Sequence, residues 1–448
     1  MRRKEEEDVY SGLRGASSSP KARSLPRLPA RGARPGPGAA PSPLRLMIYA
    51  QDGLGLGHMR RTTSIAAELI KLHPDAVVLT VEDSPLGNFF RMSPNHDYVK
   101  LPSIEKLRQG DWRAVNLPLR FEDVRAMREQ LIRSLALNFR PDILLVDHMP
   151  HGAMGELRVA LEALRDALPE TRLVLGLRDI IDAPEVIVRR WQVEGAYEAL
   201  ERFYDLVLVY GSRDVFDLAQ QYRLPPKIAK KVRYCGYLCT PAVARYPERI
   251  RAQYTQGANT GTKLVVAMAG GGADAYPMMR AVLDALPALR AEERVAIVLI
   301  TGPFMPSAER RKLQARAAGL RAQVRITVSD PLSYIDAADL IVARAGYNTT
   351  TEILRSSTPV LLIPRPGPSA EQRTRARLFA ERGWVDVLDQ DDMSDDAVTG
   401  AIVKGLRRPR SPRPLPRPEL GGLRVAVEQL VSLLAARRRG ARLAPTGG

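Results

Sequence analysis

The segment 338–383 contains polar side chains at a spacing that suits the binding of a phosphorylated ligand. An apolar run reaches Gly346, a polar stretch with Asn348 and Thr349 follows, and a second apolar run covers 360–363. This alternation predicts a strand, a helix and a second, parallel strand, which places the helix N-terminus at the carboxyl edge of the sheet. Unsatisfied N–H groups and the positive end of the helix dipole favour a phosphate there. Gly346 would let the backbone approach that phosphate closely.

Acidic side chains beyond this turn indicate that the phosphate belongs to a nucleotide that carries a sugar. Thr349 and Thr350 could add hydroxyl donors, and Glu352 lies one helical turn further on. A carboxylate there would repel a bare phosphate but can accept two hydrogen bonds from a ribose diol. After the second apolar run, a Pro- and Gly-rich loop ends at Glu371 and Gln372, a carboxylate beside an amide that suits several sugar hydroxyls. Each residue alone is more often structural, but their joint spacing favours a nucleotide-sugar site.

The motif RAGYNTTTE, which begins at Arg344, and the acidic-Gln pair after it resemble the donor-binding half of GT-B glycosyltransferases. The similarity is greatest to glycosyltransferase family 28, which includes the lipid II-forming N-acetylglucosaminyltransferase. The motif is also similar to the plant secondary-product glucosyltransferase signature. It differs from that signature in having Arg344 for histidine, Tyr347 for tryptophan and Glu371 for aspartate.

The resemblance implies a role for each residue on the donor side. It implies that Glu352 binds the ribose and that Gly346 and Thr349 lie near the diphosphate. The acidic-Gln pair would bind the sugar. The glycines at 270–272 resemble the loop that opens the family's donor domain and faces the diphosphate, and 330–332 lie where its base-contacting segment would be. The expected donor-binding residues are Gly271, Gly272, Arg344, Gly346, Asn348, Thr349, Glu352, Glu371 and Gln372.

Gly57 and His58 follow the first buried strand, 45–50, and open an amphipathic helix. The glycine loop before them reads G-x-G-x-G instead of G-x-G-x-x-G, so we discount an NAD-type dinucleotide site. The Gly-His pair resembles the first loop of the GT-B acceptor half, in which the histidine of several families is the general base or contacts the acceptor. Histidine suits proton removal from a hydroxyl near neutral pH, although a lone histidine can equally be a helix cap or a packing residue. Arg60 would meet an anionic group or be solvated.

Two more predicted strands end in polar clusters at the sheet edge where ligands bind. Asp147, His148 and His151 follow one strand, and Arg178 and Asp179 end another. Because an acid can orient a neighbouring histidine as a base, His148 with Asp147 is the rival to the first histidine. The pair His148-x-x-His151 with an aspartate could also ligate zinc, but no further Cys or His is spaced to complete that site. The expected catalytic residues are His58, His148 and Asp147, and the expected acceptor-binding residues are Gly57, Arg60, His151 and Asp179.

The net charge of +17 on 448 residues belongs mostly to the two ends of the chain. Residues 1–44 carry +5 and residues 404–448 carry +9, which leaves +3 for residues 45–403. No basic segment is interleaved with aromatic residues, so specific nucleic-acid binding is a weak alternative. The sequence has no apolar run that would span a bilayer and no signal peptide, and its two cysteines suit a reducing compartment. We therefore expect a cytoplasmic protein, with a peripheral contact at the inner face of the membrane as an alternative.

The segmentation predicts the GT-B fold, an α/β architecture of two doubly wound, Rossmann-like domains that face a cleft. Proline-rich residues 407–419 cannot form a helix, whereas residues 420–438 have helical periodicity. That last helix would dock on the first domain or lie on a membrane surface. The expected segments are a disordered tail (1–44), an acceptor domain (45–239), a linker (240–262), a donor domain (263–406), a spacer (407–419), a helix (420–438) and a disordered end (439–448).

These residues predict an inverting, metal-independent glycosyltransferase that moves a sugar from a nucleotide-diphosphate donor, expected to be a UDP-sugar, to an unknown acceptor hydroxyl. No Asp-x-Asp motif lies among the expected donor- and acceptor-binding residues, which fits a metal-independent transferase, and no cofactor is expected beyond the donor itself. Two alternatives remain open: a nucleotide-sugar epimerase of the same architecture, and a non-catalytic nucleotide-binding or lipid-associated protein. The sequence does not name the acceptor, the sugar or the base.

Overall fold

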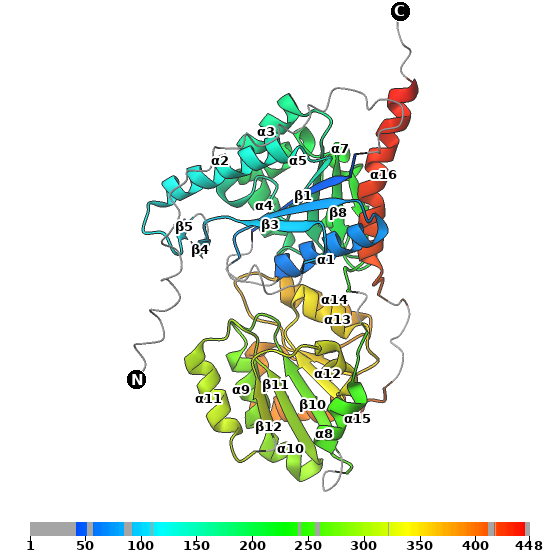
Figure 1. Ribbon diagram of the computed structural model, residues 1–448. Helices are drawn as coiled ribbons and strands as arrows, with labels where there is room; N and C mark the ends of the chain where they lie inside the picture. The colour runs from blue at the N-terminus through cyan, green and yellow to red at the C-terminus, as the bar shows by residue number, and fades with distance from the viewer. Residues whose placement is uncertain are drawn as a thin grey trace, which may run out of the picture. The chain divides into compact units, whose positions relative to one another are not determined.

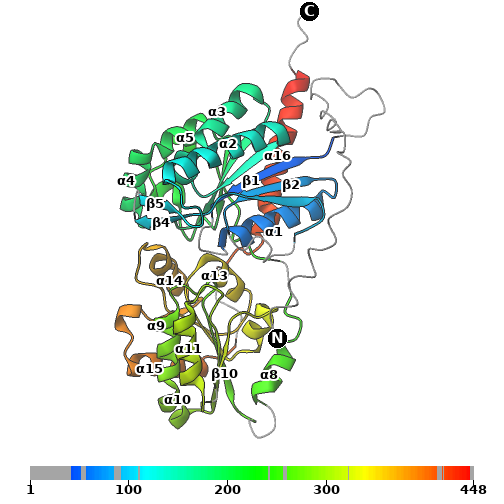
Figure 2. The same cartoon turned by 60° about the vertical axis from the view of Figure 1, so that its left-hand side comes forward.

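The computed structural model describes residues 42–51, 57–84, 92–108, 111–240, 243–255, 260–320, 322–410, 416 and 418–443. The predicted tail at 1–44 therefore lies almost wholly outside the described residues, and so does most of the first glycine loop, 52–56. Two parallel sheets organise the rest. We refer to residues 43–240 as the N-terminal lobe and to residues 243–410 as the C-terminal lobe (Figures 1 and 2).

The N-terminal lobe has a seven-stranded sheet with the strand order β3-β2-β1-β6-β7-β8-β9. All of its strand pairs are parallel. Because β1 lies between β2 and β6, the chain winds away from it in both directions, so the carboxyl ends of β1 and β6 form a topological switch point where ligands bind. The strands are β1 (Arg45–Ala50), β2 (Val77–Glu82), β3 (His96–Lys100), β6 (Ile143–Asp147), β7 (Arg172–Arg178), β8 (Leu206–Tyr210) and β9 (Val232–Tyr234).

Helices cover both faces of this sheet because its strands are apolar on both sides. Along β1, Leu46 and Ile48 pack in one buried cluster with α1, whereas Met47 and Tyr49 pack in another with α2 and α3 (Figure 1). A short antiparallel hairpin, β4 (Ile104–Arg108) and β5 (Asp111–Ala114), lies outside the sheet. The helices are α1 (Gly57–Leu72), α2 (Phe121–Phe139), α3 (Arg158–Ala167), α4 (Pro184–Glu194), α5 (Ala196–Arg202), α6 (Leu218–Gln221) and α7 (Pro226–Ala229), with a 3-10 turn, η2 (Ala153–Gly155).

The C-terminal lobe repeats this architecture with a six-stranded parallel sheet in the order β12-β11-β10-β13-β14-β15. Its switch point lies between β10 and β13, which brings the loops after these two strands together. The strands are β10 (Lys263–Met268), β11 (Val295–Ile300), β12 (Ala322–Arg325), β13 (Leu340–Ala343), β14 (Val360–Leu362) and β15 (Asp386–Val387). The helices are α8 (Pro247–Thr255), α9 (Tyr276–Asp284), α10 (Leu286–Glu292), α11 (Ser307–Ala317), α12 (Pro331–Ala337), α13 (Tyr347–Ile353), α14 (Glu371–Glu381) and α15 (Asp395–Arg407), with η4 (Gln390–Asp392).

The C-terminal helix α16 (Gly422–Leu443) returns to the N-terminal lobe and packs against α1 and β7 (Figure 1). Its buried side chains include Leu423, Val427 and Leu430, which belong to the same apolar cluster as Leu46 and Ile48 of β1. Within the described ranges, no helix has the length and apolarity needed to cross a membrane. Both cysteines, Cys235 and Cys239, are free thiols in buried positions.

Two segments differ from the sequence-based expectation. The expected linker, 240–262, contains α8, which packs on α12. Arg251 of α8 donates to the carbonyl of Ala337, the last residue of α12, and pairs with Asp339, and Tyr254 donates a hydrogen bond to Gln323 of β12. The last helix ends at Leu443, so it extends into the segment that was expected to be disordered. In both cases the polar sequence has a weak local preference for helix, so it did not predict one. Tertiary contacts or the length of the helix stabilise it in the structure.

Candidate active site

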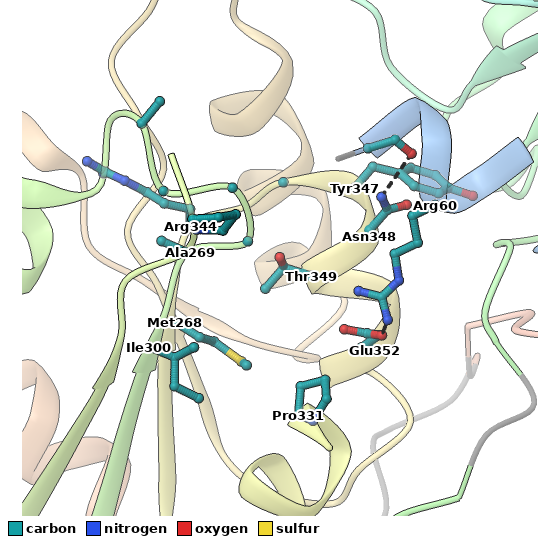
Figure 3. A pocket seen from close by; sticks show the side chains of 18 of the residues that line it. Arg60, Met268, Ala269, Ile300, Pro331, Arg344, Tyr347, Asn348, Thr349 and Glu352 are labelled. Carbon is teal, nitrogen blue, oxygen red and sulfur yellow. Dashed lines mark hydrogen bonds and ion pairs between the residues drawn. The ribbon is translucent and has the colours of Figure 1, made fainter. Parts of the chain in front are cut away.

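A cavity of about 840 Å³ is lined by both lobes, and every expected donor-binding residue contributes to its wall. Figure 3 labels Arg344, Asn348, Thr349 and Glu352 among them. The N-terminal lobe contributes Gly57, His58, Arg60 and Arg61 from the start of α1, and Arg178 from the end of β7. The topology explains this convergence, because the switch points of both sheets supply the lining loops. The donor-side lining residues include Gly271, Gly272, Arg344, Gly346, Asn348, Thr349, Glu352, Glu371 and Gln372.

The glycine loop after β10 has a backbone conformation that requires glycine. Gly270 and Gly272 have φ of 58° and 89°, in the left-handed region that disfavours other residues. A Cβ on Gly272 would also lie 1.8 Å from the carbonyl oxygen of Thr301. The loop therefore presents bare backbone to the cavity. Gly346 is different: its φ is −68°, so no turn requires glycine there, and a Cβ on it would meet no protein atom within 4 Å. Its contribution is open space beside the cavity.

The first turn of α13 faces the cavity, but its polar side chains do not all serve it. Thr349 lines the cavity (Figure 3), whereas the Thr350 hydroxyl donates to the carbonyls of Gly346 and Tyr347 inside the helix. The expectation that Thr350 supplies a donor to a ligand is therefore wrong, because its hydroxyl is already used. Asn348 donates from Nδ2 to the Gly57 carbonyl at 3.1 Å, which ties the two lobes together at the rim of the cavity.

Glu352 is nearly buried in the cavity wall, and its carboxylate forms an ion pair with Arg60 of the opposite lobe (Figure 3). Apolar side chains flank this end of the cavity, with Met268, Ile300 and Pro331 labelled in Figure 3. The combination of a carboxylate and an apolar slot suits a ribose and its attached base. Sequence reasoning missed Met268 and Ile300, although each is the last residue of its strand, β10 or β11, at the sheet edge where ligands bind.

The segment expected to contact the base contributes unevenly. Pro331 lines the cavity. Asp330 instead caps α12 by accepting from the Ser333 N–H and also accepts from the Arg245 N–H, at 3.1 and 3.0 Å. Its carboxylate is therefore occupied by structural partners.

Arg344 lies in the wall of the glycine-rich end of the cavity. Its guanidinium donates to the carbonyls of Ile363 and Asp274 at 3.0 and 2.8 Å, which fixes its position. Burial lowers its pKa from the usual value. Within the described residues, its Nε–H is buried and has no hydrogen-bond partner. Such an N–H group is available to an anionic ligand in the cavity.

Glu371 and Gln372 also line the cavity, but Glu371 is already held by two arginines. Arg178 of the N-terminal lobe donates to both of its carboxylate oxygens at 2.9 and 3.0 Å, and Arg375 donates to Oε1 at 2.9 Å. Burial opposes ionisation, yet these two cations hold the pKa of Glu371 below its usual value. Gln372 accepts a longer hydrogen bond, 3.3 Å, from the Arg365 N–H.

Asp179 requires a correction, because it was expected to bind the acceptor. Both of its carboxylate oxygens accept hydrogen bonds from Arg375, at 2.6 and 3.0 Å, and its side chain is 2% exposed. It lines neither of the two large cavities. Asp179 therefore links the lobes and has no exposed group for a substrate.

His58 is positioned by a carboxylate from a distant strand. Its Nδ1 lies 2.6 Å from Oδ2 of Asp147, the last residue of β6, and Arg61 donates to both oxygens of the same carboxylate at 3.1 and 2.5 Å. Burial disfavours the charged carboxylate, but Arg61 and His58 hold the pKa of Asp147 well below its usual range. An ionised Asp147 that accepts from Nδ1–H leaves Nε2 as the basic nitrogen of His58. Sequence reasoning assigned Asp147 to His148, and the structure corrects that pairing.

A second cavity of about 780 Å³ lies within the N-terminal lobe and shares His58 and Arg178 with the first. Both His148 and His151 line it, together with aromatic and charged side chains from β5, α2 and α4. No group of three metal-ligating side chains occurs in the part of the chain that the structure describes, so the zinc alternative has no support there. Of the four expected acceptor-side residues, His151 lines this cavity, and Gly57 and Arg60 line the first.

Comparison with known proteins agrees with this geometry. Residues 265–419 match the glycosyltransferase family 28 C-terminal domain. A UDP-N-acetylglucosamine--N-acetylmuramyl-(pentapeptide) pyrophosphoryl-undecaprenol N-acetylglucosamine transferase of Natranaerobius thermophilus is 28% identical over 136 residues, 30% of this chain and 37% of the relative. The protein of the same name from Verminephrobacter eiseniae is 29% identical over 182 residues, 40% of this chain and 49% of the relative. The chain thus spans less than half the length of these relatives.

Solved structures show the fold over most of the chain. MurG of Acinetobacter baumannii has a TM-score of 0.54 at 16% identity and covers 88% of this chain and 100% of its own. A putative UDP-N-acetylglucosamine 2-epimerase of Listeria monocytogenes has a TM-score of 0.58 at 11% identity, with coverages of 89% and 97%. The fold is thus shared by transferases and epimerases. Together these similarities show that the chain has the GT-B fold and that its C-terminal lobe is similar to the glycosyltransferase family 28 C-terminal domain.

Proposed function

We propose that this chain transfers a sugar from a UDP-sugar to an acceptor hydroxyl, with inversion at the anomeric carbon and without a metal ion. One observation carries the proposal: His58, held by Asp147, lies in the wall between the cavity that contains the donor-side residues and the second cavity. A base in that position can contact a donor on one side and an acceptor on the other. The relatives' names, which include a UDP-sugar donor, support the choice of nucleotide.

In this mechanism the acceptor hydroxyl loses its proton to Nε2 of His58 while its oxygen attacks the anomeric carbon. The bond from that carbon to the diphosphate oxygen breaks, and the nucleoside diphosphate leaves with the bonding electrons. Attack from the face opposite the leaving group inverts the anomeric centre. Asp147 then stabilises the protonated His58.

The diphosphate charge is neutralised by protein groups in the proposed reaction. The backbone of Gly270 to Gly272, the open space at Gly346 and the unpaired Nε–H of Arg344 surround one end of the cavity. Fixed donors aimed at the developing charge stabilise a leaving group without solvent reorganisation. Once its ion pair with Arg60 is broken, Glu352 accepts hydrogen bonds from the ribose hydroxyls. Gln372 binds the sugar.

The second cavity receives the acceptor, and a peripheral membrane contact would present a lipid-linked one. Large apolar side chains are exposed around β5 and α2, near this cavity: Leu117 at 38%, Leu119 at 49%, Met127 at 42% and Leu131 at 40%. Trp112 and Arg125 from the same elements line the cavity itself. Co-sedimentation with vesicles containing anionic lipid tests this contact, and binding that survives replacement of all four apolar residues by serine contradicts it.

The decisive experiment incubates the full chain with radiolabelled UDP-N-acetylglucosamine, with and without the N-acetylmuramyl-(pentapeptide) pyrophosphoryl-undecaprenol acceptor of the relatives, and measures UDP and labelled products. Transfer predicts acceptor-dependent UDP release and label on the acceptor. Isomerised nucleotide sugar without acceptor would instead establish the epimerase. If UDP binds to the chain but no UDP is formed from any of a panel of UDP-sugars, the non-catalytic alternative is established.

A further inference from the structure

His148 has a backbone conformation that is unfavourable for its residue type. It follows the last residue of β6 with φ of 86°, in the left-handed region that glycine adopts readily and other residues adopt at a cost in free energy. Its N–H donates to the Gly176 carbonyl on β7 at 2.9 Å, so the sheet holds this conformation in place. Strained backbone that a fold maintains is concentrated at functional sites. Because glycine would relieve the strain, the presence of an imidazole at this position points to a role for the side chain itself.

The imidazole of His148 lies in the wall of the second cavity, with its ring centroid 5.7 Å from that of His58. Its Nδ1 is buried and has no hydrogen-bond partner among the described residues. A histidine with a purely structural role normally has its buried nitrogens paired, because an unpaired buried polar atom costs free energy. The open nitrogen therefore points to a partner that the protein alone does not supply.

Burial and the positively charged groups around His148 favour its neutral form. Burial is the largest cause of a pKa well below the usual value, followed by Arg178 and His58, with a smaller contribution from Arg190. Asp147 acts in the opposite direction, but its carboxylate is occupied by Arg61 and His58. A neutral imidazole has one donor and one acceptor nitrogen, so it can bind a hydroxyl without competing for the proton.

We propose that His148 positions the acceptor by hydrogen-bonding the attacking hydroxyl and holding it against His58. The inference rests on the proposed transferase function and adds the residue that aligns the acceptor. A hydroxyl oxygen bound to one nitrogen of each ring lies about 2.8 Å from both. The two ring centroids are 5.7 Å apart, which brings both imidazoles close to the same small space. His58, whose Nδ1 is held by Asp147, removes the proton, and His148 is the positioning residue.

Three variants at this one position separate strain from alignment. His148→Gly removes the imidazole and relieves the strain, so its melting temperature should be no lower than that of the wild type. Its KM for the lipid-linked acceptor should rise about tenfold, the effect of losing a buried hydrogen bond, with the affinity for UDP unchanged. His148→Asn tolerates positive φ and keeps hydrogen-bonding groups, so it should recover part of that loss. His148→Ala should match His148→Gly in KM and be less stable.

Donor hydrolysis by water, measured in parallel, makes the test independent of the choice of acceptor. Water takes the place of the hydroxyl, so His148→Gly should hydrolyse UDP-N-acetylglucosamine more slowly at an unchanged KM for the donor. Wild-type rates in both assays would overturn the positioning role and leave the transferase intact. Failure of the transferase is recognised separately, because the wild type would then neither transfer nor hydrolyse.

Discussion

Arg375 on α14 donates from Nε and a terminal nitrogen to the two carboxylate oxygens of Asp179, at 3.0 and 2.6 Å, and so joins the two lobes. Neither side chain is exposed by more than 2%. Removing Asp179 takes two charge-assisted hydrogen bonds from the buried Arg375 guanidinium and leaves it Glu371 as a carboxylate partner. The first cavity, which contains the donor-side residues, lies beside this contact. The pair therefore fixes the distance between those residues and His58, the proposed catalytic base.

Asp179→Ala should therefore lower the free energy of unfolding by about 3–5 kcal/mol, as measured by urea denaturation. Asp391→Ala is the matched control, because it removes a partner of Arg373 on the same helix, where the side chains are 35% and 68% exposed. That exposed pair should contribute less than about 1 kcal/mol. Equal losses in the two variants would show that the lobes do not depend on the buried pair.

Replacing His58 should abolish most turnover without changing the affinity for the donor nucleotide. A positioned base contributes about a hundred- to ten-thousandfold to the rate, so His58→Ala should lose that much in kcat while calorimetry shows an unchanged affinity for UDP. His73→Ala, at the far end of α1, serves as the control for changes in helix stability. Wild-type turnover in His58→Ala would remove His58 from the mechanism and promote His148 as the base.

Asp147→Asn should reduce turnover by holding His58 in the wrong tautomer. The carboxylate accepts from Nδ1–H of His58, whereas an amide can donate to that nitrogen and leave the proton on Nε2. We expect a fall in kcat of about a hundredfold or more at an unchanged affinity for UDP. Arg61, which binds both oxygens of Asp147, loses its charged partner and one of the two acceptor oxygens by this change, so the melting temperature must be measured alongside. A variant with a normal kcat would show that Asp147 only supports Arg61.

The sequence predicted the local parts of the site better than the contacts between them. The glycine loop and the segment from Arg344 to Glu352 were found because each is a strand, a turn and a helix that are contiguous in the chain. The partnership of His58 with Asp147 joins residues 89 positions apart, and that of Arg178 with Glu371 joins residues 193 apart. Local periodicity has no information about which side chains meet across a sheet edge or between lobes. This is why Asp147 and Asp179 were assigned the wrong partners.

Glu352 should determine the preference for an intact ribose. In the wild type, UDP should bind more tightly than its 2′,3′-dideoxy analogue, because hydrogen bonds to a charged group contribute about 1.5–3 kcal/mol. Glu352→Ala should bind both ligands with similar, weaker affinity, as measured by calorimetry. The change also releases Arg60, so Arg60→Ala is the control: it should keep the discrimination between the two ligands. A Glu352→Ala variant that still discriminates would place the ribose elsewhere.

His96 on β3 should make the stability of the N-terminal lobe depend on pH. The residue is 8% exposed, and Nε2 lies 2.9 Å from the Thr80 hydroxyl. Burial lowers the pKa of His96 from 6.5 to about 4. Between these values the unfolded chain binds more protons than the folded one, so the free energy of unfolding falls as the pH drops from 6.5 to 4. The fall amounts to roughly 3 kcal/mol in total, and stability from this source is constant above the window.

His96→Gln cannot gain that proton when the chain unfolds, so its free energy of unfolding should depend less on pH between 4 and 6.5 than that of the wild type. Urea denaturation at several pH values measures this difference. His73→Gln, at the end of α1, is the control for replacing a histidine by glutamine elsewhere in this lobe. The contributions of His148 and His151 to the pH dependence of unfolding are common to all three proteins and cancel in the comparison. An identical slope in His96→Gln would mean that the folded protein accepts the proton on His96 as readily as the unfolded chain does.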